Sequence, residues 1–258
     1  MIGNKNSWRS SGVSETIGFI IIFGIVMTGI SIVALYGYPA LTQEQANANV
    51  KNMEKNLLVL QNDLKSLTFK SVPYQETAMQ ISGGTLMIKK DVPSTPHFDV
   101  HIGTNTEQFS PGELRYESSD GQATLTLENG AVHIRYWSSP NGSAMLSTPS
   151  WYYDSKVNPP TYVIQFIRIN GTSDLTQTGI GTVRMQLVES SQSEPISVSS
   201  DDYIEYMPSI SNHYGVAWNN YLRDPSLELQ ESPGTNEFHF KAGSQLIKKY
   251  YNVTFLSL

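Results

Sequence analysis

An uninterrupted apolar stretch at residues 17–38 constrains this chain more than any other feature. It reads IGFIIIFGIVMTGISIVALYGY and holds no charged side chain. A helix of about 22 residues is roughly 33 Å long, enough to cross the hydrocarbon core of a bilayer. Nothing later in the sequence is comparable. We therefore expect a short N-terminal head, one membrane helix and one large domain outside the membrane.

Composition excludes several kinds of site and partner. The chain has 258 residues, a net charge of −6 and no cysteine. Without cysteine there are no disulfides, thiolate zinc sites or cysteine nucleophiles. Without a basic excess or a basic stripe, nucleic acid is not an expected partner. The part after residue 70 is long enough for one domain with its own core.

The charges that flank the apolar stretch predict its orientation. Lys5 and Arg9 precede it, whereas Glu44 is the first charged residue behind it. The positive-inside rule then places the N-terminus in the cytoplasm and the large domain outside the cell. Tyr36 and Tyr38 close the stretch, as interfacial aromatics do. The apolar core is too long for a conventional signal peptide, so we expect a single-pass protein of the cell membrane.

A second helical pattern follows the membrane span. Pro39 is expected to kink or interrupt the helix. Beyond it, apolar residues recur at alternating spacings of three and four, which predicts an amphipathic helix. They are Val50, Met53, Leu57, Leu60, Leu64 and Leu67. Two arrangements stay open: this face packs on the chain's own domain, or it packs against copies of itself in an oligomer.

From Ala78 onward the pattern alternates, which is typical of β-strands. Turn signals at residues 82–84, 120–121, 129–130, 140–142 and 170–171 divide the strand-like runs. Residues 123–137 form the clearest hairpin, because Asn-Gly suits a type I′ turn. A short helix is expected at about residues 212–223. The predicted runs are 85–90, 98–102, 113–118, 123–128, 131–137, 161–169, 182–188, 195–199, 227–232, 237–240 and 250–258.

The expected fold class is therefore α+β. A long N-terminal helix, first transmembrane and then amphipathic, leads into a β-rich, antiparallel, sandwich-like domain with one short late helix.

The N-terminal sequence GVSETIGFIIIFGIV resembles archaeal type IV pilin-like and archaellin-like proteins. The resemblance implies that a prepilin-peptidase-like enzyme cuts between Gly12 and Val13. It also implies that Glu15 is the acidic residue near the new amine. Two interpretations of Glu15 stay open: a carboxylate that favours the helix dipole at the headgroup level, or one that pairs with a cation on a neighbouring subunit. Two positions depart from the pattern: Ser11 stands where a base is usual, and Glu15 would be the third mature residue rather than the fifth.

The segment GELRYESSDGQATLTLENGAVHIRYW is similar to a set of uncharacterised archaeal membrane proteins with pilin-like N-termini. This second resemblance implies a shared architecture and no activity. The expected divisions are a leader at 1–12, a transmembrane helix at 13–38, an amphipathic spine at 39–70 and an extracellular β-rich domain at 71–258.

Few side chains suggest chemistry. His97, Asp99 and His101 alternate and would share one face of a strand, which is a plausible metal spacing. The apolar residues between them favour a half-buried strand with a polar solvent side, so we expect no metal site and no cofactor. His133, His213 and His239 are isolated in the sequence and carry no motif.

The acidic residues Asp201, Asp202 and Glu205 are interpreted as a solvated loop, because they lack the spacing of a calcium loop. No hydrolase, P-loop, zincin or dinucleotide motif occurs, so we do not expect an enzyme.

Three sequons matter if the large domain is outside the cell. Asn141, Asn170 and Asn252 each begin an Asn-X-Ser/Thr triplet and are the candidate glycosylation sites. Asn252 lies in a strand-like run and is the weakest of them.

These observations predict a cell-surface pilin-like structural protein, anchored by its N-terminal helix and assembled into or onto a pilus-like filament. Its expected partners are the lipid bilayer, copies of itself or other pilin-like subunits, and the processing enzyme. The alternative is a non-assembling, membrane-anchored β-sandwich that binds a ligand. An anchored hydrolase ranks last.

Overall fold

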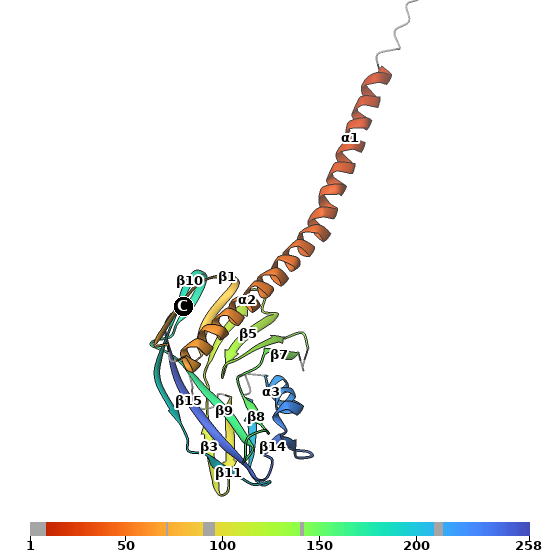
Figure 1. Cartoon of the computed structure of the whole chain (residues 1–258). Coiled ribbons are helices and arrows are strands. Elements are labelled where there is room, and N and C mark those ends of the chain that lie inside the picture. The colour runs from red at the N-terminus through yellow and green to blue at the C-terminus, as the bar shows by residue number, and fades with distance from the viewer. Residues whose placement is uncertain (1–8, 71, 90–95, 140–141, 209–213) are drawn as a thin grey trace, which may run out of the picture. The chain divides into compact units, whose positions relative to one another are not determined.

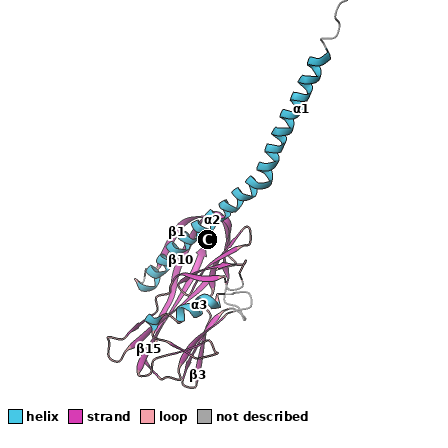
Figure 2. Ribbon diagram, turned by 90° about the vertical axis from the view of Figure 1, so that its right-hand side faces the viewer, coloured by secondary structure: helices cyan, strands magenta, loops and turns pink. Residues whose placement is uncertain are grey.

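The structure, a computed structural model, describes residues 9–70, 72–89, 96–139, 142–208 and 214–258. It has one long N-terminal helix, a β-rich and mostly antiparallel domain, and one short late helix (Figures 1 and 2). The predicted fold class is confirmed. The chain divides into two compact units, Met1–Ala48 and Asn49–Leu258, which are described separately.

The N-terminal helix continues through Pro39 instead of breaking there. Helix α1 (Arg9–Ile32) leads through a π-helical turn, η1 (Val33–Gly37), into α2 (Tyr38–Phe69). A proline removes one backbone donor and crowds the carbonyl four residues earlier, here that of Leu35. That carbonyl lies in the π-helical turn, where the helix is wider. The α-helical hydrogen-bonding pattern is thus interrupted by a π-helical turn just before Pro39, while the helix as a whole continues through the proline.

The second half of α2 packs on the β-rich domain of its own chain. The six apolar residues at three-and-four spacing, from Val50 to Leu67, are all buried in one hydrophobic cluster with strands of the larger sheet. Both ribbon views show α2 lying beside β1 (Tyr74–Lys89) (Figures 1 and 2). Of the two arrangements left open by the sequence, this face adopts the first, so it is not available for packing against copies.

The larger sheet has ten strands, and its neighbours are antiparallel with one exception. The long C-terminal strand β15 (Ser244–Ser257) runs parallel to β9 (Thr161–Gly171). The strand β11 (Ile196–Val198) lies outside the main order and pairs with β15. In spatial order the sheet is β7 (Ser143–Ser147), β6 (Ala131–Tyr136), β5 (Ala123–Glu128), β4 (Glu113–Ser118), β1, β10 (Thr176–Gln192), β15, β9 and β8 (Tyr152–Asp154).

A second, antiparallel sheet of five strands completes the sandwich. Between it and the larger sheet lies an aromatic core that includes Phe98, Phe166 and Trp218, the last from α3 (Gly215–Leu222). The Phe98 ring centroid is 4.8 Å from that of Trp218. The order of this sheet is β13 (Gln230–Glu231), β14 (Glu237–His239), β12 (Tyr203–Met207), β2 (His97–Ile102) and β3 (Asn105–Phe109).

The Asn-Gly hairpin is confirmed. Asn129 and Gly130, between β5 and β6, have φ angles of 47° and 75°, as a type I′ turn requires. The Asn129 side chain also accepts a hydrogen bond from the backbone N–H of Ile167, at 2.8 Å. The turn therefore joins the hairpin to β9 as well as closing it.

Two other turn signals are wrong. Residues 82–84 lie inside β1, where a register shift between Ile81 and Leu86 and a φ of 60° at Gly83 mark a bulge. Asn170 and Gly171 are the last two residues of β9 and still pair with the parallel neighbour β15, so the chain leaves the strand after them rather than at them. In each case the ladder to a distant strand outweighs the local turn preference.

The late elements also differ from expectation. The predicted strand at 227–232 begins in a 3-10 turn, η2 (Pro225–Leu227), and only Gln230–Glu231 are extended. The backbone N–H of Ser226 donates to the Asp224 side chain at the start of this turn, which stabilises it. Helix α3 is shorter than predicted, and residues 212–213 of that prediction lie outside the described residues.

Candidate functional site

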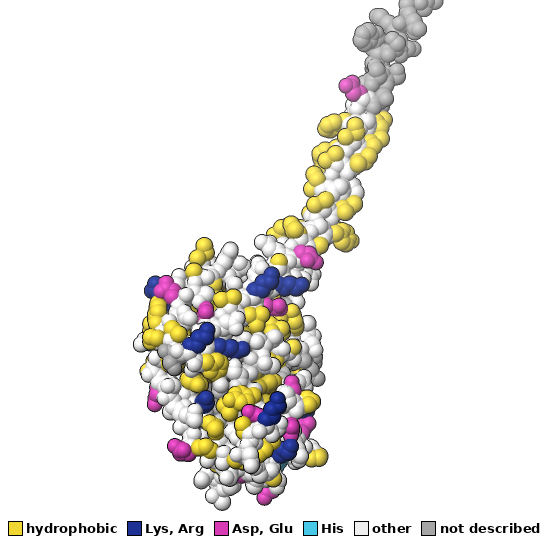
Figure 3. All heavy atoms as spheres, in the orientation of Figure 1, with side chains coloured by type: hydrophobic (Ala, Val, Ile, Leu, Met, Phe, Trp, Pro, Cys, Tyr) yellow, Lys and Arg dark blue, Asp and Glu magenta, His cyan; other side chains and the backbone are white. Residues whose placement is uncertain are grey.

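The apolar helix is the most distinctive surface of the chain. It is long and apolar enough to cross a membrane, and none of its most apolar window is buried. Hydrophobic side chains follow α1 along its visible face (Figure 3). The hydroxyls of Thr28 and Ser31 donate to the carbonyls of Gly24 and Met27, each at 2.8 Å. A helix in hydrocarbon needs its polar groups to be hydrogen-bonded within the protein, because no water is there to bind them.

The residues predicted for processing and assembly lie at the start of this helix. Gly12 and Val13 fall within α1, whose backbone is helical from Arg9 onward. Glu15 is exposed. The bond between Gly12 and Val13 stays the predicted cleavage point, and the role of Glu15 in assembly stays a prediction.

The sequons are not equivalent. Asn170 and Asn252 lie on neighbouring strands, and the Asn170 side-chain nitrogen donates to the Asn252 side-chain oxygen at 2.8 Å. A glycan on Asn170 would use the nitrogen that makes this bond. Asn141 lies outside the described residues.

A buried polar layer lies on one face of β4, β5 and β6. Glu128 is fully buried and accepts hydrogen bonds from the Tyr206 hydroxyl at 3.1 Å and the Trp218 indole N–H at 3.4 Å. Its cross-strand neighbour Glu113 is also buried and pairs with Arg115. The opposite face of the same strands belongs to the hydrophobic cluster with α2.

Burial dominates the electrostatics of this layer. It raises the pKa of Glu128 to about 8, and the nearby Glu113 carboxylate adds to that rise. Burial also raises the pKa of Glu113, against the opposing effect of Arg115. His133 on β6 is buried against the rings of Tyr214 and Trp218, and burial lowers its pKa to about 3. Near neutral pH, Glu128 is therefore largely protonated and His133 is neutral.

This layer was not expected from the sequence. The alternation in residues 123–128 and 131–136 indicates a hairpin with one apolar and one polar side, and a polar side is normally solvated. Here α3 and β12 cover it, since Trp218 and Tyr206 both bond to Glu128. Nothing in the local sequence indicates that Glu128 contacts Tyr206 and Trp218, because these residues lie 78 and 90 positions later in the chain.

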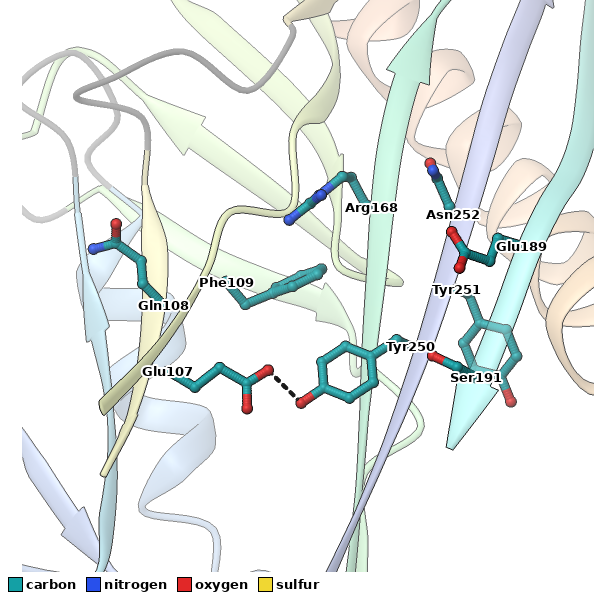
Figure 4. A pocket seen from close by; sticks show the side chains of 9 residues that line it. All are labelled: Glu107, Gln108, Phe109, Arg168, Glu189, Ser191, Tyr250, Tyr251 and Asn252. Atoms are coloured by element: carbon teal, nitrogen blue, oxygen red, sulfur yellow. Dashed lines mark hydrogen bonds between the residues drawn. The ribbon is translucent and has the colours of Figure 1, made fainter. Parts of the chain in front are cut away.

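A shallow pocket lies where β3 approaches β9, β10 and β15 (Figure 4). Its volume is about 190 Å³, below the ~300–1,000 Å³ of typical ligand sites. The Arg168 guanidinium lies 5.3 Å from the Phe109 ring centroid. Glu107 accepts from the Tyr250 hydroxyl at 2.5 Å and pairs with Lys248. Such a pocket suits a small polar group rather than a large substrate.

The alternating polar residues of β2 do share a face, as predicted. His101 and Asp99 project from β2, and their cross-strand neighbours on β12 are Tyr203 and Glu205. One ligand atom each from Asp99, His101 and Glu205 lies within 4.8 Å of the others. The sequence did not connect Glu205 with β2, because 104 positions separate it from His101.

Asp202 does not belong to a solvated acidic loop. It is buried and accepts from the backbone N–H groups of Gly103 and Ser199, each at 2.7 Å. Burial acts to raise its pKa, but these hydrogen bonds outweigh it and lower the pKa. The residue ties two loops together, and the interpretation as a solvated loop is wrong for it.

Comparison with known proteins places the chain in a family. The profile of a "Family of unknown function (DUF7289)" matches residues 11–240. The chain belongs to this family. It is also 32% identical over 98 residues to an uncharacterised protein of Archaeoglobus fulgidus, a match that covers 38% of this chain and 31% of that relative. No solved structure matches the chain. Neither similarity assigns a biochemical activity to this chain.

Proposed function

We propose that this chain is a pilin-like structural protein of the cell surface, held in the membrane by its N-terminal helix and assembled through it. One observation carries the proposal: the two halves of a single continuous helix have opposite burial. The side chains of residues 19–23 are all exposed, whereas Leu57, Leu60 and Leu64 are fully buried in the chain's own domain. An apolar surface of that extent needs lipid or other apolar helices around it.

The small residues of α1 support assembly beyond simple anchoring. A side chain added at Gly18, Gly24 or Gly29 would meet nothing within 4 Å. The glycines are therefore not needed for packing inside the described part of this chain. In lipid, small residues allow two helices to approach closely. Copies of the chain, or other pilin-like subunits, are the proposed neighbours.

The proposed route begins with removal of residues 1–12 by a prepilin-peptidase-like enzyme. The large domain would lie outside the cell, where Asn141, Asn170 and Asn252 are the glycosylation candidates. The mature chain would begin at Val13, with Glu15 two residues from the new amine. The intact mass of the protein from native membranes tests this step. A mature start at Val13 supports it, and a retained leader in assembled protein overturns it.

Assembly is tested by a pair of variants within the span. Gly24→Leu keeps the helix apolar but blocks close approach, and Val26→Leu is the matched control at an exposed neighbouring position. We expect both variants in the membrane fraction. Only Gly24→Leu should lose chemical crosslinking between copies and filament formation. Unchanged assembly in Gly24→Leu would contradict close packing at this glycine.

The second candidate is a non-assembling, anchored binding module. The polar pocket at Arg168 and Glu107 is the observation that favours it (Figure 4). This candidate predicts an intact leader, no crosslinking between copies in the wild type, and no effect of Gly24→Leu.

A further inference from the structure

The solvent-side face of the smaller sheet carries imidazoles and carboxylates in two adjacent cross-strand rows. One row consists of His101, Tyr203 and His239, and the other consists of Asp99, Glu205 and Glu237. These six residues form what we call the histidine face. The opposite side of the same strands is apolar and buried, with Phe98, Val100 and Ile204 at 0–2% exposure. The sheet thus provides a rigid base for the polar groups.

Two of these residues already have the spacing of metal ligands, and a third lies close to them. The Nε2 atom of His101 lies 3.5 Å from Oε1 of Glu205. Two ligand atoms bound to one tetrahedral zinc ion at about 2.1 Å would lie about 3.4 Å apart. Asp99 supplies the third atom, within 4.8 Å of the other two. A small side-chain adjustment of Asp99 closes the triangle.

The imidazole of His101 is held in the orientation that metal binding needs. Its Nδ1 lies 2.8 Å from the Thr106 hydroxyl, and its ring stacks on Tyr203 with centroids 4.1 Å apart. The other nitrogen, Nε2, is buried and makes no hydrogen bond to the described residues. Metal-binding histidines typically donate from one ring nitrogen to a protein oxygen and leave the other for the ion.

Charge favours a cation at this place. Glu205 lies between Asp99 and Glu237 in the cross-strand row, and like charges in such positions repel. Two carboxylates and a neutral imidazole would balance a doubly charged ion. The Gln108 amide, 3.3 Å from Asp99, is placed to orient one of these carboxylates.

We propose that Asp99, His101 and Glu205 bind one divalent transition-metal ion of the zinc class. An imidazole ligand favours zinc, cobalt or nickel over calcium and magnesium, which prefer oxygen-only sites. Water fills the remaining coordination positions on the solvent side. The competing explanation is a set of plain ion pairs, since His97 lies 3.7 Å from Asp99 and His239 lies 3.7 Å from Glu237.

Calorimetric titration separates the two explanations. Zn²⁺ is titrated into the full chain in detergent, without a polyhistidine tag and after removal of metal by a chelator. We expect saturable one-to-one binding in the wild type. His101→Gln and Glu205→Gln should each weaken it at least about tenfold, the lower end of what even supporting residues cost a metal site. Thr106→Val should weaken Zn²⁺ binding by a similar factor, because valine lacks the hydroxyl that holds the His101 imidazole in place through Nδ1.

His239→Gln is the matched control, because it removes an imidazole from the same row without touching the three ligands. Its Zn²⁺ affinity should equal that of the wild type. Co²⁺ provides a spectroscopic check: its visible absorption should appear in the wild type and His239→Gln but not in His101→Gln. Urea midpoints of the metal-free variants establish that each one is folded.

Three results would overturn the site. The first is no saturable Zn²⁺ binding by the wild type. The second is equal loss of binding in His239→Gln and His101→Gln. The third is unchanged affinity in folded Glu205→Gln. The site does not depend on filament assembly, so a failed assembly experiment leaves this test intact.

Discussion

Replacement of Glu128 by glutamine should remove a large pH dependence from the stability of the β-rich domain. Burial raises the pKa of Glu128 to about 8 from an ordinary value of 4.5. Between these two values the folded chain keeps the proton and the unfolded chain has lost it. The wild type therefore loses stability as pH rises through this window. The difference between the folded and unfolded pKa values of Glu128 corresponds to about 5 kcal/mol of unfolding free energy at most. That is a large part of the ~5–15 kcal/mol by which typical domains are stable.

The surroundings of Glu128 explain why its carboxyl stays protonated in the folded chain. Glu128 is inaccessible to solvent, and its carboxyl accepts hydrogen bonds from two neutral groups, the Tyr206 hydroxyl and the Trp218 indole N–H. Its neighbour Glu113 also has a raised pKa, so the two carboxyls titrate as a coupled pair. Glutamine keeps the shape of the protonated acid and cannot ionise.

The assay is urea unfolding followed by tryptophan fluorescence at pH 5, 7 and 9. Wild type and Glu128→Gln should have similar pH 5 stabilities, and the variant should become the more stable protein at pH 9. Glu117→Gln is the matched control, because Glu117 lies on β4 with its side chain 47% exposed. Its pH profile should follow the wild type. Parallel profiles for wild type and Glu128→Gln would refute the assignment of a buried, neutral carboxyl.

Further predictions concern the core, the hairpin turn and the buried histidine. Leu60→Ala should cost about 2–5 kcal/mol in urea unfolding, because Leu60 is fully buried, whereas Val59→Ala, at a half-exposed position, should cost far less. Asn129→Ala should cost about 1–3 kcal/mol, since it removes the acceptor for the Ile167 N–H; a cost near zero would mean that water replaces it. Burial lowers the pKa of His133 to about 3 from 6.5, so the wild type should lose stability as pH falls through that window, and His133→Leu should lack this loss in the same assay.

Local patterns predicted the elements that local forces control. The Asn-Gly turn formed as expected, because both of its residues tolerate positive φ and nothing distant competes. Residues 82–84 and 170–171 also carry turn signals. They became strand, because β4, β10 and β15 supply backbone partners that the local sequence does not reveal.

The same limit applies to the candidate sites. The spacing of His97, Asp99 and His101 predicted a shared strand face, and β2 has it. The third ligand, Glu205, comes from β12, and its position depends on how two distant strands pair. Glu128 shows the converse: the alternation in residues 123–128 predicted a strand, but not that both faces of this strand would be buried.

The sequence by itself determined that this chain has an uncharged helix long enough to span a membrane, followed by an amphipathic helix and a β-rich domain. Those properties follow from hydrophobicity and periodicity along neighbouring residues. Only the tertiary structure decided that the amphipathic face is buried in the chain's own domain, that Glu128 and His133 are enclosed, and that Glu205 joins His101. Burial and proximity of that kind depend on contacts between segments far apart in the chain, which periodicity does not encode.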